Sequence, residues 1–267
     1  MKYEEAKAKS KILNIYKNVD PWFWISGSIN PYRGCEHNCV YCDGKAKYYN
    51  IDNFGDHIRV KMNAPELLRK DLNKLGFNPI NRTGKNTIEY YFGDKVENNI
   101  PKGSPNAPLI AVGGGICDVY QPAEKQFKIT RKILHVLYEY GFPIDILTKS
   151  DLVLRDIDLI KKFLEISYVN IASSITLMDE DLQKKVEPHS STTSERFNAL
   201  KKLKDLGCTT GVMAMPLLPG IGDKRENIEK IISKSSELGI DYIIFAGLTL
   251  KPGNKEIVYE FIQKNFP

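Results

Sequence analysis

Short runs of apolar and β-branched residues recur along the chain, and polar or turn-forming residues bound each of them. Runs of this length and composition are typical of buried strands. Six segments fit this description: 25–29, 109–112, 144–147, 169–174, 210–215 and 242–250. The pattern therefore predicts six strands distributed over most of the chain.

Longer stretches with helical spacing of their apolar residues separate these runs. The predicted helices are 64–75, 122–140, 152–166, 193–206, 224–238 and 255–266. Gly141, Gly207 and Gly239 stand where three of these helices should end, as a left-handed C-terminal cap favours. Because strands and helices alternate, the sequence predicts an α/β fold, a (β/α)6 partial TIM barrel of parallel strands.

Two segments depart from this alternation. In residues 1–24 we expect an N-terminal helix or strap, because apolar residues within 3–16 have helical spacing before Pro21 ends the segment. Residues 77–108 are rich in Asn, Gly and Pro, with 87–92 as a candidate strand, and we interpret them as an insertion. The predicted organisation is thus a strap, 1–24, followed by one barrel domain, 25–267.

Composition narrows the class of protein. The chain has 267 residues, of which 42% are hydrophobic, enough for one sizeable core. Its mean hydropathy is −0.33, no apolar run is long enough to span a bilayer, and the lysine-rich start does not fit a secretory signal. We therefore expect a cytoplasmic protein. The net charge of +5 suits an anionic partner such as nucleic acid without requiring one, since the basic residues are spread evenly.

The cysteines carry the clearest chemical signal. Three of the five, Cys35, Cys39 and Cys42, form a C-x3-C-x2-C pattern directly after the first predicted strand. In a reducing compartment such thiols serve metals rather than disulfides. Three thiolates leave one iron of a 4Fe–4S cluster open, whereas a structural zinc site closes with four ligands. A fourth ligand from His37 or a distant cysteine would make a zinc site, so zinc stays an alternative.

With Tyr41 before its last cysteine, the pattern resembles that of the radical S-adenosylmethionine (SAM) superfamily. The segment Asn30-Pro31-Tyr32-Arg33-Gly34-Cys35-Glu36-His37-Asn38-Cys39-Val40-Tyr41-Cys42 is similar to the spore photoproduct lyase-related branch. Segments 118–124, 147–156, 187–188 and 215–223 agree with it. The resemblance implies a 4Fe–4S cluster and SAM as cofactors, with SAM lying across the carboxyl ends of the strands.

The resemblance also implies an activity. Reductive cleavage of SAM would give a 5′-deoxyadenosyl radical that abstracts hydrogen from an unidentified substrate, with a DNA photoproduct as one candidate. The electron donor would be a reducing protein such as ferredoxin or flavodoxin. Trp22, Phe23 and Trp24 would stack on bases or form a lid. A non-catalytic metal or iron–sulfur module that contacts nucleic acid is the alternative; a barrel hydrolase lacks a compelling catalytic pair.

Individual cofactor contacts follow from the resemblance, each with a plainer alternative. Residues expected near SAM are Tyr41, Gly113, Gly114, Gly115, Lys149 and Ser174. A simple turn would equally explain the glycines, and a solvated side chain would explain the lysine. Glu187 and Arg196 are predicted to form an ion pair at the barrel rim rather than to contact SAM.

Cys117 is a candidate hydrogen-atom donor, because relatives carry such a cysteine after the second strand. Relative to Asp118, its position is shifted from that of the cysteine in the relatives. The alternative is that Cys117 is a small, inert residue at the barrel rim. The segment 43–49, after the third cysteine, also departs from the family pattern. These departures leave the substrate contacts open.

Overall fold

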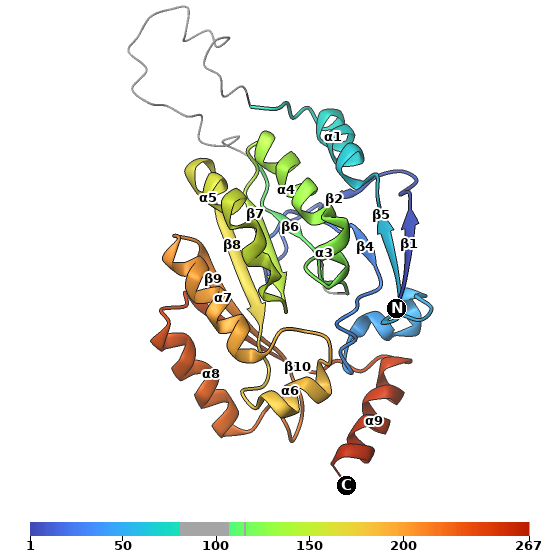
Figure 1. Ribbon diagram of the computed structural model, residues 1–267, viewed down its shortest axis with the longest axis vertical. Coiled ribbons are helices and arrows are strands. Elements are labelled where there is room, and N and C mark those ends of the chain that lie inside the picture. The colour runs from blue at the N-terminus through green and yellow to red at the C-terminus, as the bar shows by residue number, and fades with distance from the viewer. Residues whose placement is uncertain (81–106, 115, 267) are drawn as a thin grey trace, which may run out of the picture.

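The computed structural model describes residues 1–80, 107–114 and 116–266 (Figure 1). Its main sheet has seven strands in the order β10-β9-β8-β7-β6-β3-β2. The strands are β2 Leu13–Ile15, β3 Gly27–Ile29, β6 Ile110–Val112, β7 Ile144–Thr148, β8 Val169–Ser174, β9 Thr209–Leu217 and β10 Tyr242–Gly247. Strands β3 and β6 to β10 are parallel in sequence order, while β2 lies antiparallel to β3. This arrangement confirms the six predicted strands and the partial TIM barrel.

The described helices are α1 Ala64–Lys74, α3 Ala123–Phe127, α4 Ile129–Glu139, α5 Ile157–Ile166, α6 Glu180–Val186, α7 Thr193–Asp205, α8 Arg225–Glu237 and α9 Asn254–Asn265. Short 3₁₀ segments occur at Asp43–Lys45, Lys47–Tyr49 and Asp151–Asp156. The predicted helix 122–140 is in fact two helices, because Lys128 adopts a left-handed conformation with φ 52°. The Glu124 carboxylate accepts the backbone N–H of Thr130 at 2.9 Å, which caps the start of α4.

The prediction of an N-terminal helix is wrong. Residues 1–24 contain β1 Lys2–Ala6 and β2, and β1 pairs in parallel with β5 His57–Lys61. Strand β5 also pairs with β4 Tyr32–Arg33, forming a second sheet, β1-β5-β4, that sequence periodicity did not reveal. Asp71, on α1, accepts the N–H groups of Ile12 and Leu13 at 2.8 and 3.1 Å and so ties the start of β2 to that helix. These partners lie too far along the chain for a local pattern to show them.

Side-chain alternation divides the main sheet into a packed face and a hollow face. On β7, Ile144 and Ile146 point to the helices and are fully buried in the largest hydrophobic cluster. Asp145 and Leu147 point to the opposite face and line a cavity. Helices α4, α5 and α7 lie along one side of the main sheet in Figure 1, and the cavity residues come from its other face.

The candidate strand 87–92 falls in residues 81–106, outside the described residues, so the larger part of the proposed insertion has no structural test.

Among the helices of the described ranges, none is both long and apolar enough to cross a bilayer.

Candidate functional site

The three clustered cysteines lie on a loop that follows β4 and is largely buried. Cys35 and Cys39 are each 6% exposed, and Cys42 is half-buried. The loop turns tightly, since the N–H of Cys42 donates to the carbonyl of Cys39 at 3.2 Å and Asn38 adopts a φ of 49°. Cys39 and Cys42 line the cavity on the inner face of the barrel. The loop thus presents thiols to that cavity.

A second loop, residues 118–124, which follows β6 and runs into the first turn of α3, holds the cysteine loop in place. The N–H of Glu36 donates to Gln121 Oε1 at 2.9 Å, and the Glu36 carboxylate accepts the N–H of Ala123 at 2.5 Å. Both Gln121 and Glu124 are fully buried, and Tyr32 donates its hydroxyl hydrogen bond to Glu124. Buried polar groups of this kind fix one backbone arrangement when all are paired. The family-like segment 118–124 therefore holds the cysteine loop in one conformation through hydrogen bonds.

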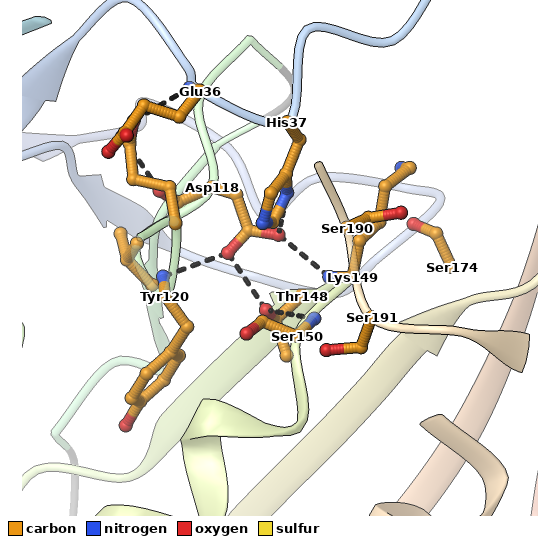
Figure 2. A network of polar contacts seen from close by, with 12 residues as sticks. Glu36, His37, Asp118, Tyr120, Thr148, Lys149, Ser150, Ser174, Ser190 and Ser191 are labelled. Atoms are coloured by element: carbon orange, nitrogen blue, oxygen red, sulfur yellow. Dashed lines mark hydrogen bonds and ion pairs between the residues drawn. The ribbon is translucent and has the colours of Figure 1, made fainter. Parts of the chain in front are cut away.

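Asp118 links the two loops to the end of β7, as Figure 2 shows. His37 Nδ1 lies 3.3 Å from Asp118 Oδ2. The same carboxylate accepts hydrogen bonds from the N–H of Tyr120 at 2.8 Å, Thr148 Oγ1 at 2.8 Å and the N–H of Lys149 at 2.7 Å. Burial alone would raise the pKa of Asp118, but His37 and these donors lower it to about 2. Asp118 is thus an ionised anchor between the cysteine loop and the barrel.

Glu187 and Arg196 form a buried ion pair under the cysteine loop, which confirms the predicted pairing. Their atoms Oε2 and Nη2 are 2.5 Å apart, and each residue is 1% exposed. Tyr41 donates its hydroxyl hydrogen bond to Glu187, and Arg196 Nη1 donates to the carbonyl of Ser174 at 2.7 Å. Burial favours the neutral carboxyl, yet Arg196 and Lys149 keep the pKa of Glu187 below its usual value. The pair therefore orients Tyr41 and the end of β8.

Lys149 directly follows β7, and its ammonium group lies 5.8 Å from the centre of the Tyr41 ring. Burial would lower the pKa of Lys149, but its electrostatic interactions with Cys39 and Glu187 outweigh burial and raise it. The side chain therefore remains a cation while it lines the cavity. Such a point charge suits a carboxylate or phosphate ligand.

The cavity has a volume of about 320 Å³, and many of its lining residues lie at or just after the carboxyl ends of the strands. Five predicted cofactor contacts lie on its wall: Tyr41, Gly113, Gly114, Lys149 and Ser174. Gly113 adopts a φ of 116°, which a side chain would strain. Gly115, the sixth, is outside the described residues. The structure thus brings together residues spread over four of the six βα units.

Cys117 lies on another side of the cysteine loop. Its sulfur is 3.4 Å from the carbonyl oxygen of Gly34, and the residue is 6% exposed. Gln121 Nε2 donates to this sulfur at 3.3 Å. Neither Cys117 nor Cys35 belongs to the described cavity wall. The shifted sequence position of Cys117 therefore corresponds to a thiol that packs against the backbone of the cysteine loop at Gly34.

The three loop cysteines supply the soft donors that an iron–sulfur cluster requires. Within residues 1–80, 107–114 and 116–266, no three Cys, His, Asp or Glu side chains are close enough to share a single metal ion. Burial raises the pKa of all three loop thiols, that of Cys39 to about 12. Thiolates in such a site need a positive centre to balance them. Three soft donors around a larger group meet that need and leave one iron free.

Several residues that build this site were not identified individually in the sequence. Asp118, Gln121 and Glu124 are polar side chains at or below 9% exposure, and their partners lie on the cysteine loop and on β4. The sequence did show a family-like segment at 118–124, but no periodicity signals that its side chains point inward. Their role in holding the cysteine loop becomes apparent only from their hydrogen bonds with residues distant in the sequence.

The comparisons with known proteins agree with this geometry. The family model described as "Radical SAM superfamily" matches residues 29–234. An uncharacterized protein of Methanocaldococcus jannaschii is 31% identical over 241 residues, covering 90% of this chain and 76% of that protein. An uncharacterized protein of Mycobacterium tuberculosis is 25% identical over 229 residues, 84% of this chain and 59% of the relative. The chain thus spans little more than half of the mycobacterial protein.

Solved structures show the same fold. Spore photoproduct lyase complexed with dinucleoside spore photoproduct aligns with a TM-score of 0.64 and 14% identity, covering 99% of this chain and 67% of that one. A mutant of the lyase with bound AdoMet and the same dinucleoside gives a TM-score of 0.61, again with 14% identity, over 95% of this chain and 66% of the other. At this identity the similarity shows the fold alone.

Two findings decide the family. The matching model spans well over half of the chain, and the archaeal relative exceeds 30% identity over most of both proteins. Enzymes of the matched family use a 4Fe–4S cluster and SAM, and the described thiols and cavity are compatible with both. This chain belongs to the radical SAM superfamily.

Proposed function

We propose that Cys35, Cys39 and Cys42 hold the 4Fe–4S cluster and that the adjoining cavity receives SAM together with an organic substrate from which hydrogen is abstracted. The observation that carries this proposal is the shared cavity wall, on which cysteine-loop thiols meet a cation, a glycine turn and the end of β8. When bound, the cluster supplies the electron that cleaves SAM. The protein binds, orients and shields the reactants.

The polar groups of the wall support distinct contacts with SAM. The Lys149 ammonium group suits the SAM carboxylate, and the backbone around Gly113 and Gly114 can approach its amino group closely. Tyr41 would lie against the adenine, since its hydroxyl is already fixed by Glu187. Ser174, at the end of β8, would reach the ribose or the carboxylate. These contacts leave the apolar part of the cavity for the substrate.

Apolar side chains would protect reactive species in this cavity from water. Phe23, Ile25, Leu147, Met213 and Met215 all contribute to the wall. A closed apolar environment suppresses side reactions of an activated substrate. The composition of the wall therefore supports radical chemistry on a largely uncharged group.

Production of 5′-deoxyadenosine tests the proposal. We expect anaerobically reconstituted protein, given dithionite and SAM, to form this product far above a Cys39→Ala background. Lys149→Met should weaken SAM binding about 10-fold or more, as expected for loss of a charged contact, whereas Lys162→Met on the exposed side of α5 should not. Wild-type protein that yields no more product than Cys39→Ala would contradict the proposal.

Iron and sulfide analysis gives a second check. A 4Fe–4S cluster predicts about four irons and about four sulfides per chain and a spectral change on adding SAM. One zinc without sulfide would instead support a non-catalytic metal-binding module. This measurement requires no knowledge of the substrate.

For the substrate, we propose a DNA photoproduct as the first candidate to test. Trp22 and Trp24 are 70% and 75% exposed, and Phe23 between them lines the cavity, so a base could stack at its entrance. The neighbour named above was solved with dinucleoside spore photoproduct. The mild positive charge of the chain is compatible with a nucleic acid.

Cys117 is proposed as the hydrogen donor for that reaction, a role that would require its thiol, packed against the Gly34 carbonyl outside the described cavity wall, to turn toward the substrate. Burial, aided by the nearby Asp118 charge, raises the pKa of the thiol well above its usual value, so the sulfur retains its hydrogen. Conversion of dinucleoside spore photoproduct by the holoenzyme, with a changed product in Cys117→Ala, is the expected result. If 5′-deoxyadenosine forms but the dinucleoside is not converted, the DNA photoproduct is excluded and SAM cleavage stands.

A further inference from the structure

A carboxylate faces the cavity far from the cysteine loop. Asp145 is the second residue of β7 and belongs to the cavity wall together with Leu147 and Lys149. Four residues of strand place Asp145 about 13 Å from Lys149 along β7, toward the amino end of the strand. The cavity wall therefore has a cation near the cysteine loop and an acidic group toward the amino end of β7.

Two polar side chains from neighbouring strands hold this carboxylate. Asn170, paired with Asp145 in the β7–β8 register, donates from Nδ2 to Asp145 Oδ1 at 2.5 Å. The Tyr242 hydroxyl, from β10, donates to Asn170 Oδ1 at 3.1 Å and lies 2.8 Å from Asn170 Nδ2. Three strands thus contribute one chain of hydrogen bonds below the apolar wall. We call Asp145, Asn170 and Tyr242 the floor triad.

Gly211 makes the floor triad geometrically feasible. It lies on β9, between β8 and β10, and pairs with Tyr242 in the sheet register. A Cβ atom at this position would meet the Tyr242 ring carbon Cζ at 2.2 Å. Only a residue without a side chain lets the tyrosine ring cross β9 and reach Asn170. The sequence therefore carries a small residue where this contact requires one.

The charge of Asp145 is unbalanced in the described part of the chain. One carboxylate oxygen accepts from Asn170, and for the other no donor is found among the described residues. No described lysine, arginine or histidine forms an ion pair with it either. Burial raises the pKa of Asp145 to about 6, against a smaller opposing effect of Asn170. Near neutral pH an ionised group with a free acceptor thus faces the cavity.

If residue 145 only filled space inside the barrel, it would not need to be a carboxylate. Asparagine would accept the same hydrogen bond from Asn170 without a desolvated charge, and an apolar residue would fill the space. A ligand that brings an N–H group to the open oxygen would supply the missing partner. A carboxylate at position 145 is therefore better explained by ligand binding than by packing of the barrel interior.

We propose that Asp145 is a specificity-determining residue, which accepts a hydrogen bond from an N–H group at the deep end of the substrate. Asn170 and Tyr242 act as positioning residues for it. The substrate class is a planar ring bearing an N–H donor, either a neutral imide or an amidinium cation. This inference rests on the proposed function, because it takes the cavity as the substrate site.

Binding of two matched probe pairs to the reconstituted holoprotein tests the inference. The pairs are 1-methylthymine with 1,3-dimethylthymine and benzamidinium with acetophenone; in each pair only the first member has an N–H donor. Calorimetry with SAM present and the cluster oxidised needs no turnover, so the result is independent of SAM cleavage. We expect about tenfold or stronger preference for the donor in at least one pair, as a hydrogen bond to a charged group provides. Preference in the benzamidinium pair alone identifies a cationic substrate group.

Variants connect the preference to the floor triad. Asp145→Leu should abolish the preference, and Tyr242→Phe and Gly211→Ala should weaken it while circular dichroism shows an unchanged fold. Asp241→Asn is the matched control, because that carboxylate pairs with Lys204 and is not on the described cavity wall. Equal binding of both members in both pairs, or a preference that survives Asp145→Leu, overturns the inference. Absence of 5′-deoxyadenosine would instead bear on the proposed function only.

Discussion

At the scale of single residues, Arg196 is a buried guanidinium balanced by one carboxylate. Its exposure is 1%, like that of Glu187. Replacing one partner of a buried pair leaves the other charge unpaired in a poorly hydrated site, which costs about 3–5 kcal/mol. We therefore expect Glu187→Ala to lower the free energy of unfolding by about that amount in a urea titration.

A surface pair provides the control for this prediction. Arg225 and Glu229 are 2.7 Å apart, but their side chains are 90% and 58% exposed. Pairs of this kind contribute little because water screens them. Arg225→Ala should change the free energy of unfolding by less than about 0.5 kcal/mol. Equal effects of the two variants would contradict the assigned role of the Glu187–Arg196 pair.

Asp145 allows a prediction with a defined sign in pH. Its pKa is raised from 3.8 to about 6 by burial, so the folded state binds the proton more tightly than the unfolded state. Ionisation therefore destabilises the fold progressively as pH rises from about 4 to 6, and the cost persists above pH 6. Asp145→Asn should equal wild type near pH 4 and exceed its unfolding free energy by up to about 3 kcal/mol at pH 8.

Chemical denaturation at both pH values checks the Asp145 prediction. Removal of a charge that serves ligand binding is expected to raise stability, because the residue that binds a ligand best is often not the one that stabilises the fold most. A loss of stability at pH 8 would mean that the carboxylate has a stabilising partner in the free protein.

At the scale of elements, the loop 118–124 decides the shape of the cysteine loop. Asp118 joins His37 to the end of β7, and Gln121 fixes the backbone of Glu36. We expect Asp118→Asn to retain the circular dichroism spectrum but to bind less iron and sulfide after reconstitution, by about half or more. Removal of one outer contact of a metal site commonly lowers affinity about 10–100-fold.

Asp158→Asn is the control for this element. Its side chain is 57% exposed and pairs with Arg131 on the outside of the barrel. Its iron and sulfide content should match that of wild type. A normal cluster content in Asp118→Asn would show that the 118–124 loop does not position the thiols.

At the scale of the whole molecule, the C-terminal helix packs against the cysteine loop from the start of the chain. Figure 1 shows α9 beside the segment that follows the cysteines. Asp43 accepts hydrogen bonds from Lys251 Nζ at 2.9 Å and Asn254 Nδ2 at 3.2 Å. Val258, 2% exposed, belongs to a hydrophobic cluster with Cys39 and Tyr41. Segments about 200 residues apart in the sequence thus pack together beside the cysteine loop.

This packing predicts that α9 protects the cluster. Val258→Asp places a charge among apolar side chains and should loosen the helix, so a chelator should remove iron at least about tenfold faster than from wild type. Ile257→Asp, at a neighbouring position that is 36% exposed, should behave nearly as wild type. Identical rates of iron loss in both variants would contradict a protective role of α9.

The sequence by itself determined the features that depend on local signals. Alternation of short apolar runs with longer stretches of helical spacing revealed the six βα units, because strands such as β6 and β8 are buried throughout while each helix buries one face. The spacing of Cys35, Cys39 and Cys42 indicated a metal centre, since all three thiols lie on one loop. The cavity-lining positions of Lys149 and Ser174 also follow from their place at strand ends.

Only the tertiary structure decided the features that join distant segments. Strand β1 pairs with β5, more than fifty residues later, and its polar residues carry no strand-specific period. Asp118 meets His37, and Asp145 reaches Tyr242 through Asn170, only because the curved sheet brings their loops and strands together. Hydrogen bonds between distant residues leave no periodic trace in a sequence, whereas burial of one face of an element does.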